Sequence, residues 1–317
     1  MTRPLRAAVV GVGHLGRFHA EKYAALPEAV LVGVVDSDPE RARAVADALG
    51  VRVLADHRAL VGEVDCASVA VPTRDHAAIA GDLLAAGIDV LVEKPLASTV
   101  AEGAALVHAA DKAGRILQVG HLERFNPALR AALEVVTRPR FLECHRLATF
   151  VDRGTDVDVI HDLMIHDLDV IQSFVSAEVV AIESVGVPIL TTSVDIANAR
   201  LRFADGCIAN VTASRVSLKR ERKLRIFQPD AYVAIDYDQR SVRICRRIPP
   251  RAPGELAEIV VREHDVGEGD PLRDEVQAFL AAVATRSAPM VGGREALRAL
   301  QLAERIAASL TQDTVPS

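Results

Sequence analysis

Short apolar runs alternate with longer segments of helical periodicity over the first third of the chain. The runs are rich in Val, Leu and Ile, and they cover residues 7–10, 30–35, 67–71, 90–92 and 116–119. Between them, residues 39–49 and 75–86 carry Ala and Leu at helical spacing. Continuous apolar strands that are separated by helices are typical of a parallel sheet covered on both faces. The pattern therefore predicts an α/β domain with a doubly wound parallel sheet.

The pattern changes after about residue 137, where strand-like segments follow one another with few helices between them. A run at 141–150 precedes one helical segment at 157–174, and further β-rich segments lie at 179–187, 195–203, 208–214, 224–227, 232–236, 242–245 and 259–262. Strands in succession indicate an α+β domain with an open, largely antiparallel sheet. The tail is predicted to be helical at 272–284 and 294–310, and we expect one of these helices to pack back on the first domain.

Length and charge narrow the class of protein. At 317 residues the chain exceeds the usual size of a single domain, so we expect two domains. The net charge of −6 argues against a nucleic-acid-binding protein, although it does not exclude an anionic small-molecule substrate. The N-terminus shows no signal segment, and no apolar run reaches the ~20 residues of a membrane span. We therefore expect a cytoplasmic protein with no nucleic-acid or membrane partner.

A glycine pattern directly follows the first apolar run. It reads Gly11-Val12-Gly13-His14-Leu15-Gly16 and lies between a predicted strand and a predicted helix. Glycines at this spacing allow a tight turn, close approach of the backbone to a pyrophosphate and close packing of helix on strand, although a purely structural turn is the alternative. The pattern predicts a dinucleotide-binding Rossmann domain at 1–122, which leaves 123–317 as the second domain.

The coenzyme is predicted from the end of the second apolar run. Asp36 lies there, twenty residues after the last glycine of the pattern, where its carboxylate can accept both hydroxyls of the adenosine ribose. The same carboxylate would repel a 2′-phosphate, and residues 37–39 contain no arginine to neutralise one; Arg41 is the nearest. The sequence therefore favours NAD over NADP.

A lysine follows the apolar run at 90–92 in the sequence Glu93-Lys94-Pro95. A lysine beside a proline is ordinarily a surface turn, but this one lies at the edge where parallel sheets bind ligands. Its ammonium group could donate a hydrogen bond to a reacting oxygen and stabilise alkoxide character. Glu93 could set that charge or hold the nicotinamide ribose.

Asp162 and His166 are four residues apart in a predicted helix, so they lie on one helix face. An imidazole can take a hydroxyl proton as a hydride leaves carbon, and a nearby carboxylate can orient it. A solvated charged face and a metal site are the two alternatives. The four cysteines are scattered without a Cys-x-x-Cys pair, so we expect free thiols and no metal.

Together these motifs resemble the glucose–fructose oxidoreductase, inositol dehydrogenase and MocA (Gfo/Idh/MocA) family, and the resemblance covers essentially the whole chain. It implies that Lys94, Asp162 and His166 are the catalytic residues and that the Lys94–Pro95 peptide bond is cis. It also implies that the domain at 123–317 binds the substrate and mediates oligomerisation through its open sheet, so that the protein is a homodimer or homotetramer.

Two stretches, at 120–127 and 162–169, further resemble the branch of UDP-N-acetylglucosamine 3-dehydrogenases. This resemblance implies oxidation of a ring hydroxyl of a nucleotide sugar to a 3-keto group, for later transamination toward lipid A. Many relatives have Gly two residues before the histidine, where this chain has Met164. That departure counts against substrates of the inositol or glucose branches. A free polyol or sugar dehydrogenase and a non-catalytic dinucleotide-binding regulator are the alternatives.

Three further features concern the ligands. Arg124 and Asn126 follow the last apolar run of the first domain and either reach substrate or form a helix-entry loop with Asn126 as its cap. The basic run at 215–223 is either a solvated loop or a site for a pyrophosphate-linked substrate. The predicted substrate-binding residues are Lys94, Arg124, Asn126, Asp162 and His166. The predicted coenzyme-binding residues are Gly11, Val12, Gly13, His14, Leu15, Gly16, Asp36, Thr73, His76, Glu93 and Lys94.

Overall fold

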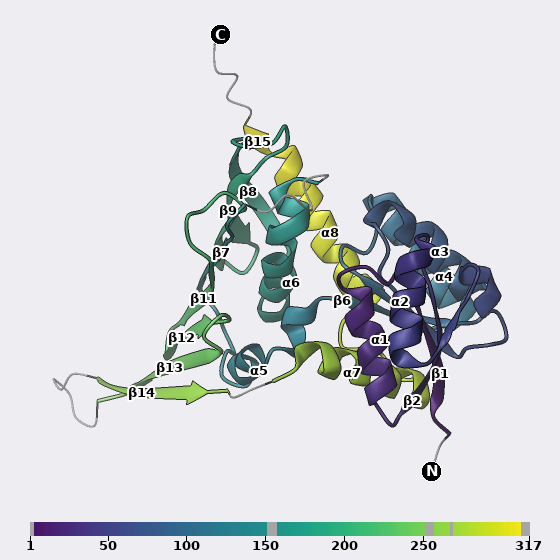
Figure 1. Ribbon diagram of the computed structural model, residues 1–317. Coiled ribbons are helices and arrows are strands. Elements are labelled where there is room, and N and C mark those ends of the chain that lie inside the picture. The colour runs from purple at the N-terminus through teal and green to yellow at the C-terminus, as the bar shows by residue number, and fades with distance from the viewer. Residues whose placement is uncertain (1–2, 151–156, 251–256, 267–268, 312–317) are drawn as a thin grey trace, which may run out of the picture. The chain divides into compact units, whose positions relative to one another are not determined.

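The computed structural model describes residues 3–150, 157–250, 257–266 and 269–311 (Figure 1). The chain forms two compact units, each with one of the two sheets. The first unit comprises Met1–Phe125 and Asp270–Leu300, and the second comprises Asn126–Gly269 and Gln301–Ser317. The domain ranges expected from the sequence, 1–122 and 123–317, stay a prediction.

The first unit is built around a parallel sheet of six strands in the order β3-β2-β1-β4-β5-β6. The strands are β1 Leu5–Val10, β2 Ala29–Val35, β3 Arg52–Val53, β4 Cys66–Val69, β5 Asp89–Glu93 and β6 Leu117–Gly120. The order reverses between β1 and β4, and ligands of doubly wound sheets bind outside the carboxyl ends of the strands at such a point. The predicted Rossmann sheet is confirmed.

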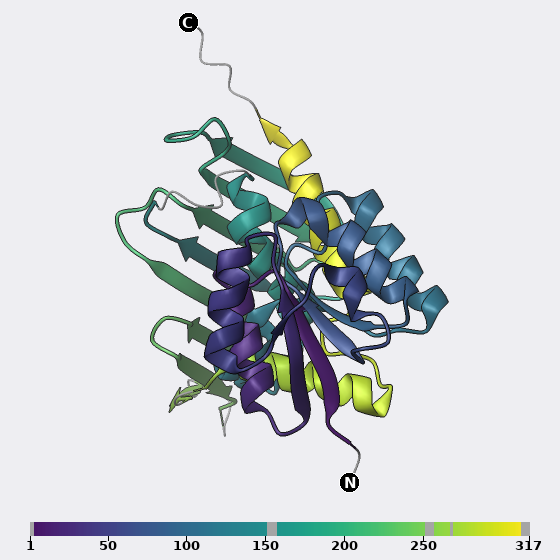
Figure 2. The ribbon, with the colours of Figure 1, turned by 45° about the vertical axis from the view of Figure 1, so that its right-hand side comes forward.

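Helices lie on both faces of this sheet (Figure 2). They are α1 Gly16–Ala25, α2 Pro39–Leu49, η1 His57–Leu60, α3 Thr73–Ala85, α4 Val100–Ala113, η2 Leu122–Phe125, α7 Pro271–Thr285 and the first part of α8 Gly293–Ala308. Alternate residues of β1 face opposite sides, so Ala7 packs in one apolar cluster with Tyr23 and Phe279, whereas Ala8 packs in another with Leu84. Each large apolar side chain buried in this way contributes ~1.5–3 kcal/mol.

The ends of α2 show how local sequence sets a helix. The Asp38 carboxylate accepts hydrogen bonds from the backbone N–H groups of Glu40 and Arg41, and Pro39 occupies the first turn. The helix stops at Gly50, whose φ of 67° lies in the left-handed region. The short α2 therefore enters directly from the end of β2, where Asp36 lies.

The second unit contains a nine-stranded sheet in the order β14-β13-β12-β11-β7-β10-β9-β8-β15. Its strands are β7 Phe141–Leu147, β8 Val179–Val187, β9 Ile196–Phe203, β10 Ile208–Ser214, β11 Glu221–Gln228, β12 Ala231–Asp236, β13 Ser241–Ile248, β14 Glu258–Asp265 and β15 Leu310–Thr311. Within the described part of this second sheet, only β7 with β10 and β8 with β15 pair in parallel. The predicted largely antiparallel sheet is confirmed.

One face of this sheet is buried, as the strict alternation along β9 shows. The helices of this unit are α5 Pro127–Leu133, the π-helical turn η3 Ile160–Met164 and α6 Ile165–Phe174, which continues directly from η3. The Arg146 guanidinium on β7 donates two hydrogen bonds of 3.0 Å to the Asp167 carboxylate on α6, and both side chains are buried. This two-pronged pair ties the helix that carries His166 to the centre of the sheet.

The cysteines and the apolar character of the helices are the features that the sequence composition had addressed. The four cysteines are free, and Cys66, Cys144 and Cys207 are buried, as the scattered spacing predicted. Within the described ranges, no helix combines the length and the apolar character needed to cross a membrane.

Candidate active site

The first and third glycines of the turn after β1 are required by the protein's own packing. Gly11 has a φ of 83°, and a Cβ atom there would lie 2.6 Å from the carbonyl oxygen of Ala70. A Cβ atom on Gly16, the first residue of α1, would lie 1.8 Å from the carbonyl oxygen of Gly11. Both contacts are far below van der Waals distance, so larger residues would force the turn apart.

The second glycine of the turn has no such reason within the protein. A Cβ atom on Gly13 would meet nothing within 4 Å. The backbone beside it is therefore open, just before the N-terminus of α1. A pyrophosphate that accepts hydrogen bonds from this turn needs that close approach to the backbone. The residues present thus fit a dinucleotide coenzyme, which would supply the hydride acceptor.

Asp36 is the residue that predicted the choice of coenzyme, and its carboxylate is fully engaged in the structure. It accepts hydrogen bonds from the backbone N–H groups of Val12 at 2.8 Å and Asp38 at 2.9 Å. Arg41 adds two more, from Nε at 3.1 Å and from a terminal nitrogen at 2.8 Å. Burial alone would raise the pKa of Asp36, but the Arg41 and backbone hydrogen bonds outweigh it and lower that pKa. Asp36 is thus an ionised acceptor at the end of β2.

The contact between Arg41 and Asp36 bears on coenzyme choice. The Arg41 side chain is 45% exposed, whereas that of Asp36 is 4% exposed. Arg41 is therefore the member of the pair that can turn toward solvent, which would free two acceptor positions of Asp36 for ribose hydroxyls. The same guanidinium is a group that could pair with a 2′-phosphate, so Arg41 and Asp36 act in opposite directions on the discrimination between NAD and NADP.

Two other predicted coenzyme residues lie on α3. Thr73 is the first residue of this helix, and its side chain is partly buried. His76 is buried, and its ring nitrogens lie 2.8 Å from the carbonyl oxygen of Pro95 and 2.9 Å from that of Val71. Burial lowers the pKa of His76 despite these carbonyl contacts. The observed contacts make His76 a support for the segment after Lys94; direct contact of Thr73 or His76 with a coenzyme stays a prediction.

The lysine motif lies at the carboxyl end of β5. The Lys94–Pro95 peptide bond is cis, which confirms the expectation from the family resemblance. Lys94 is partly buried, and its backbone N–H donates to the Glu93 carboxylate at 3.3 Å. Glu93 lies over Gly120 of β6, where an added Cβ atom would come within 3.0 Å of a carboxylate oxygen. The glycine leaves the space that the Glu93 carboxylate occupies.

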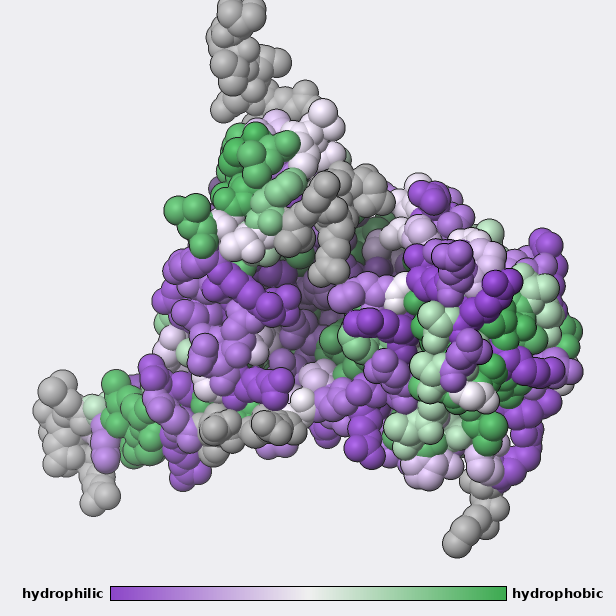
Figure 3. All heavy atoms as spheres, in the orientation of Figure 1, coloured by the Kyte–Doolittle hydropathy of each residue, from purple (hydrophilic) through white to green (hydrophobic). Residues whose placement is uncertain are grey.

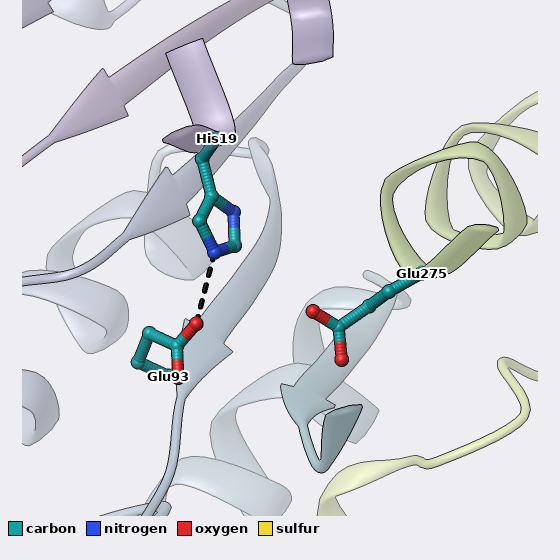
Figure 4. Close-up of side chains that lie close together, drawn as sticks. All are labelled: His19, Glu93 and Glu275. Carbon is teal, nitrogen blue, oxygen red and sulfur yellow. Dashed lines mark hydrogen bonds and ion pairs between the residues drawn. The ribbon is translucent and has the colours of Figure 1, made fainter. Parts of the chain in front are cut away.

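Sequence reasoning missed the side chains that surround Glu93. The His19 Nε2 atom on α1 lies 2.9 Å from a Glu93 carboxylate oxygen, and its Nδ1 atom lies 3.1 Å from the Ser68 hydroxyl on β4. The Tyr23 hydroxyl lies 2.9 Å from the same Ser68 oxygen. Figure 4 shows Glu275 of α7 pointing toward His19 and Glu93. Atoms of His19, Glu93 and Glu275 lie within 4.8 Å of one another.

The pKa values of the two carboxyl groups in this cluster are shifted in opposite directions. Burial acts to raise the pKa of Glu93, but the hydrogen bond from His19 and the charges of His19 and Lys94 outweigh it, so that the pKa is lowered. Burial also raises the pKa of Glu275, and the negative charge of Glu93 raises it further, to well above the ordinary range. The two shifts therefore favour the ionised form of Glu93 and the neutral form of Glu275.

A signal for this cluster exists in the sequence. Glu275 lies four residues before Phe279, and His19 lies four residues before Tyr23, so each falls on the buried stripe of its helix. A charged or polar residue on an apolar stripe is a candidate for a buried partner. The sequence does not show that Glu275 meets His19 and Glu93, because Glu275 is far from both along the chain.

The predicted catalytic pair lies in the second unit. Asp162 belongs to the π-helical turn η3 and His166 to α6, and both side chains are partly buried. π-Helical turns within helices are frequent at functional sites. Asp158 accepts hydrogen bonds from the backbone N–H groups of Ile160 and His161 and contacts the His161 ring at 2.9 Å, which accounts for part of the charge in this segment. A metal role for Asp162 and His166 stays untested.

The remaining predicted ligand residues have structural contacts of their own. Arg124 lies in η2 and is partly buried. The Asn126 side-chain oxygen accepts a hydrogen bond from the Ala128 backbone N–H at 3.0 Å, so it caps α5, as the alternative interpretation anticipated. Its contact with substrate stays a prediction.

The basic run at 215–223 is largely paired with acids of its own unit. Arg215 is buried and donates to the Val157 carbonyl oxygen at 2.6 Å. Lys219, Arg220 and Lys223 form ion pairs with Glu221, Asp238 and Asp236. These acids offset much of the positive charge that a pyrophosphate would require.

Both halves of the chain are similar to known protein families. A family model described as "Oxidoreductase family, NAD-binding Rossmann fold" matches residues 5–121, and a GFO/IDH/MocA C-terminal domain matches residues 132–232. UDP-N-acetylglucosamine 3-dehydrogenase from Acidithiobacillus ferrooxidans is 39% identical over 306 residues, which cover 95% of this chain and 96% of that protein. The chain belongs to the GFO/IDH/MocA family. It is an NAD-binding oxidoreductase, and its first unit is the NAD-binding Rossmann domain.

The similarity to members of the GFO/IDH/MocA family differs in how much of the chain it covers. The solved structure of the Acidithiobacillus ferrooxidans UDP-N-acetylglucosamine 3-dehydrogenase superposes with a TM-score of 0.90 at 36% identity, and the match covers 98% of each chain. Inositol 2-dehydrogenase 1 from Saccharopolyspora erythraea is 34% identical over 190 residues, which cover 56% of each protein. Both units of the fold are thus shared with the first relative.

Proposed function

We propose that the protein oxidises a ring hydroxyl of a nucleotide sugar with NAD, and that the substrate is UDP-N-acetylglucosamine, oxidised at C3. One observation carries this choice. The match to a UDP-N-acetylglucosamine 3-dehydrogenase runs over 95% of this chain, whereas the match to inositol 2-dehydrogenase 1 covers 56% of it. Since the second unit is expected to bind the substrate, a likeness that includes all of it is the better guide to the sugar.

The reaction breaks the C–H bond of the reacting carbon and the O–H bond of the hydroxyl group on that carbon. His166 takes the hydroxyl proton. NAD, held at the Gly11–Gly16 turn and by Asp36, would accept the hydride from the carbon. Asp162 orients the imidazole and stabilises its positive charge once the proton has arrived. Lys94 donates a hydrogen bond to the same oxygen and stabilises its developing negative charge. The products are a 3-keto sugar nucleotide, NADH and a proton.

The product suggests the next reaction. A ketone at C3 is the group that an amine-transferring enzyme requires, so we place this oxidation before a transamination of the sugar nucleotide. This is the order that a 2,3-diamino sugar of lipid A needs.

The proposal is tested by a substrate comparison. We expect NADH to form with UDP-N-acetylglucosamine, with a sugar product two hydrogen atoms lighter by mass spectrometry, and not with myo-inositol or glucose. Parallel reactions with UDP-glucose test the acetamido group, and free N-acetylglucosamine tests the nucleotide. Turnover of inositol or glucose, without turnover of any UDP-sugar, would overturn the nucleotide-sugar assignment.

A free polyol or sugar is the second candidate for the substrate. The 34% identity to inositol 2-dehydrogenase 1 favours it, and the pairing of the basic run with acids leaves less charge for a pyrophosphate. The comparison above separates the two candidates, because only a nucleotide-sugar enzyme should discriminate strongly against free N-acetylglucosamine.

We further propose that the protein assembles as a homodimer or homotetramer through its second unit. Figure 3 shows hydrophobic residues gathered around the end of β8 and β15. The exposed apolar side chains there are Val185, Val187, Ile189 and Leu190. Such a patch on a sheet face is typical of an interaction surface. Light scattering on the purified protein should give a multiple of the 33.9 kDa chain mass.

A further inference from the structure

Glu275 of α7 is a buried acid without a visible partner. Its exposed fraction is 0%, and within the described residues neither carboxyl oxygen has a hydrogen-bond partner. The same carboxyl group points at Glu93 and His19, with atoms of all three residues within 4.8 Å of one another (Figure 4). An ionised carboxylate in such a place would lose its hydration and gain no donor in exchange.

Polar and charged residues of several elements of the first unit lie near Glu275 or next to its neighbours. Helix α1 contributes His19 and Tyr23, and β4 contributes Ser68, which hydrogen-bonds with both. Strand β5 contributes Glu93, with Lys94 next to it, and the Gln118 amide of β6 donates to the backbone oxygen of Glu275 at 3.1 Å. The short helix η2, which also contacts α7, carries the charged Glu123 and Arg124 and follows the buried His121.

Two carboxylates this close in a buried site do not both ionise, because each would raise the energy of the other. Glu93 has the contacts that favour ionisation, since His19 lies 2.9 Å away and the Lys94 backbone N–H donates to it. Glu275 has neither, and burial together with Glu93 holds the pKa of Glu275 well above its ordinary range.

We propose that Glu275 is a positioning residue that keeps a proton at neutral pH, and thereby leaves Glu93 as the ionised carboxylate of the His19–Glu93–Glu275 cluster beside Lys94. A second negative charge at Glu275 would repel Glu93 and disturb the end of β5. The cluster thus makes the coenzyme domain sensitive to alkaline pH. The role assigned to Lys94 rests on the proposed function, whereas the protonation of Glu275 does not.

The sign of the effect on stability follows from the protonation states. An acid that stays neutral when folded but ionises when unfolded stabilises the unfolded chain as the pH rises above ~4.5. Wild type should therefore lose stability with rising pH from this group, until Glu275 itself ionises in the folded state. The variant Glu275→Gln keeps a neutral side chain of the same size and lacks this loss.

The experiment compares chemical unfolding of wild type and Glu275→Gln from about pH 4 to about pH 9. We expect the ratio of their unfolding constants to change about tenfold per pH unit above ~4.5, in favour of Glu275→Gln, which equals ~1.4 kcal/mol per unit. Asp274→Asn, on the same helix with a partly exposed side chain, serves as the matched control and should follow wild type. A pH-independent offset between wild type and Glu275→Gln would overturn the proposal.

A second measurement needs no variant that folds. Infrared spectra of wild type with isotope-labelled glutamate should show the carbonyl band of a protonated, buried carboxyl group at neutral pH, and this band should be absent from Glu275→Gln where that variant folds. Absence of the band in wild type would overturn the proposal. The proposal would also be overturned if each chain bound one divalent cation tightly and removal of that cation by a chelator abolished the pH-dependent difference in unfolding between wild type and Glu275→Gln. The cluster would then be a metal site.

The consequence for the coenzyme is measured by NADH fluorescence. We expect the affinity of wild type for NADH to fall at alkaline pH and that of Glu275→Gln to fall less. If neither wild type nor Glu275→Gln oxidises any sugar nucleotide but their unfolding constants diverge as described, the proposed function fails and the inference about Glu275 stands.

Discussion

Arg41 donates two hydrogen bonds to the Asp36 carboxylate, from a side chain that is 45% exposed to one that is 4% exposed. The buried acid is held in addition by the backbone N–H groups of Val12 and Asp38. The position of the acid is therefore fixed by the backbone, whereas the arginine can move. This asymmetry makes the pair a site at which coenzyme preference can be altered.

Asp36→Ala should weaken NAD binding and relax the discrimination against NADP. The change removes a charged acceptor of the ribose hydroxyls, which is worth ~1.5–3 kcal/mol or about 10–100-fold in affinity, and it frees Arg41 to meet a 2′-phosphate. Fluorescence titrations with NADH and NADPH measure both effects. Asp56→Ala is the control, because it removes the cap of η1 at a cost of ~1 kcal/mol in stability but should leave the preference unchanged. A wild-type preference for NADP would contradict the assignment.

Gly13→Ala should weaken coenzyme binding without affecting folding, whereas Gly16→Ala should disrupt the fold of the turn. The first adds a Cβ atom where nothing lies within 4 Å, so the chain should fold with a nearly unchanged melting temperature but bind NADH at least tenfold more weakly. The second places a Cβ atom 1.8 Å from the Gly11 carbonyl oxygen and should prevent the turn from forming. Thermal unfolding and NADH titration together distinguish these outcomes. Normal NADH affinity in Gly13→Ala would argue against a pyrophosphate at this turn.

His166→Ala should lower turnover by about 10²–10⁴-fold, the usual effect of losing a general base. NADH affinity should change little, because the glycine turn and Asp36 belong to the other unit. His161→Ala is a matched control, since His161 lies in the adjoining turn and is paired with Asp158. Steady-state kinetics with UDP-N-acetylglucosamine provide the test. Equal losses in the two variants would indicate a structural effect of the helix, and near-normal turnover in His166→Ala would remove the mechanism.

Lys94→Met should damage turnover to a similar extent as His166→Ala, because it removes the charge that stabilises the reacting oxygen while keeping the length of the side chain. Pre-steady-state NADH formation would show whether the hydride-transfer step itself is slowed. Lys112→Met, on the last turn of α4, is the control for the loss of a lysine and should retain wild-type turnover. A loss confined to KM would instead assign Lys94 to ground-state binding.

Acid should destabilise the second unit through Asp195. Burial acts to raise the pKa of this carboxyl, but hydrogen bonds from the backbone N–H groups of Thr191, Ile189 and Leu190 lower it to about 2. Its stabilising effect is therefore present above the unfolded-state pKa of ~3.9 and is lost as the pH falls toward about 2. Asp195→Asn should be less stable than wild type at neutral pH, and the difference should shrink in acid. A difference that is constant with pH would contradict this account.

The sequence by itself determined the features that depend on neighbouring residues. The strands of the first sheet are short apolar runs, and the Gly11–Gly16 turn follows the first of them, with glycine at the two positions, Gly11 and Gly16, that leave no room for a Cβ atom. The cap of α2 by Asp38 and the buried alternation of the second sheet are local patterns of the same kind. For these features, backbone geometry and the period of apolar residues are sufficient.

Only the tertiary structure decided which distant side chains meet. Glu275 approaches Glu93 because α7, which follows strands β7 to β14 of the second sheet along the chain, returns to the first sheet, and no periodicity encodes that return. The pairing of the basic run with Asp236 and Asp238 likewise depends on the register of β11 with β12. The surroundings of each acid then set its pKa: the pKa of Glu93, beside His19, is lowered, whereas that of Glu275, whose oxygens have no hydrogen-bond donor among the described residues, is raised.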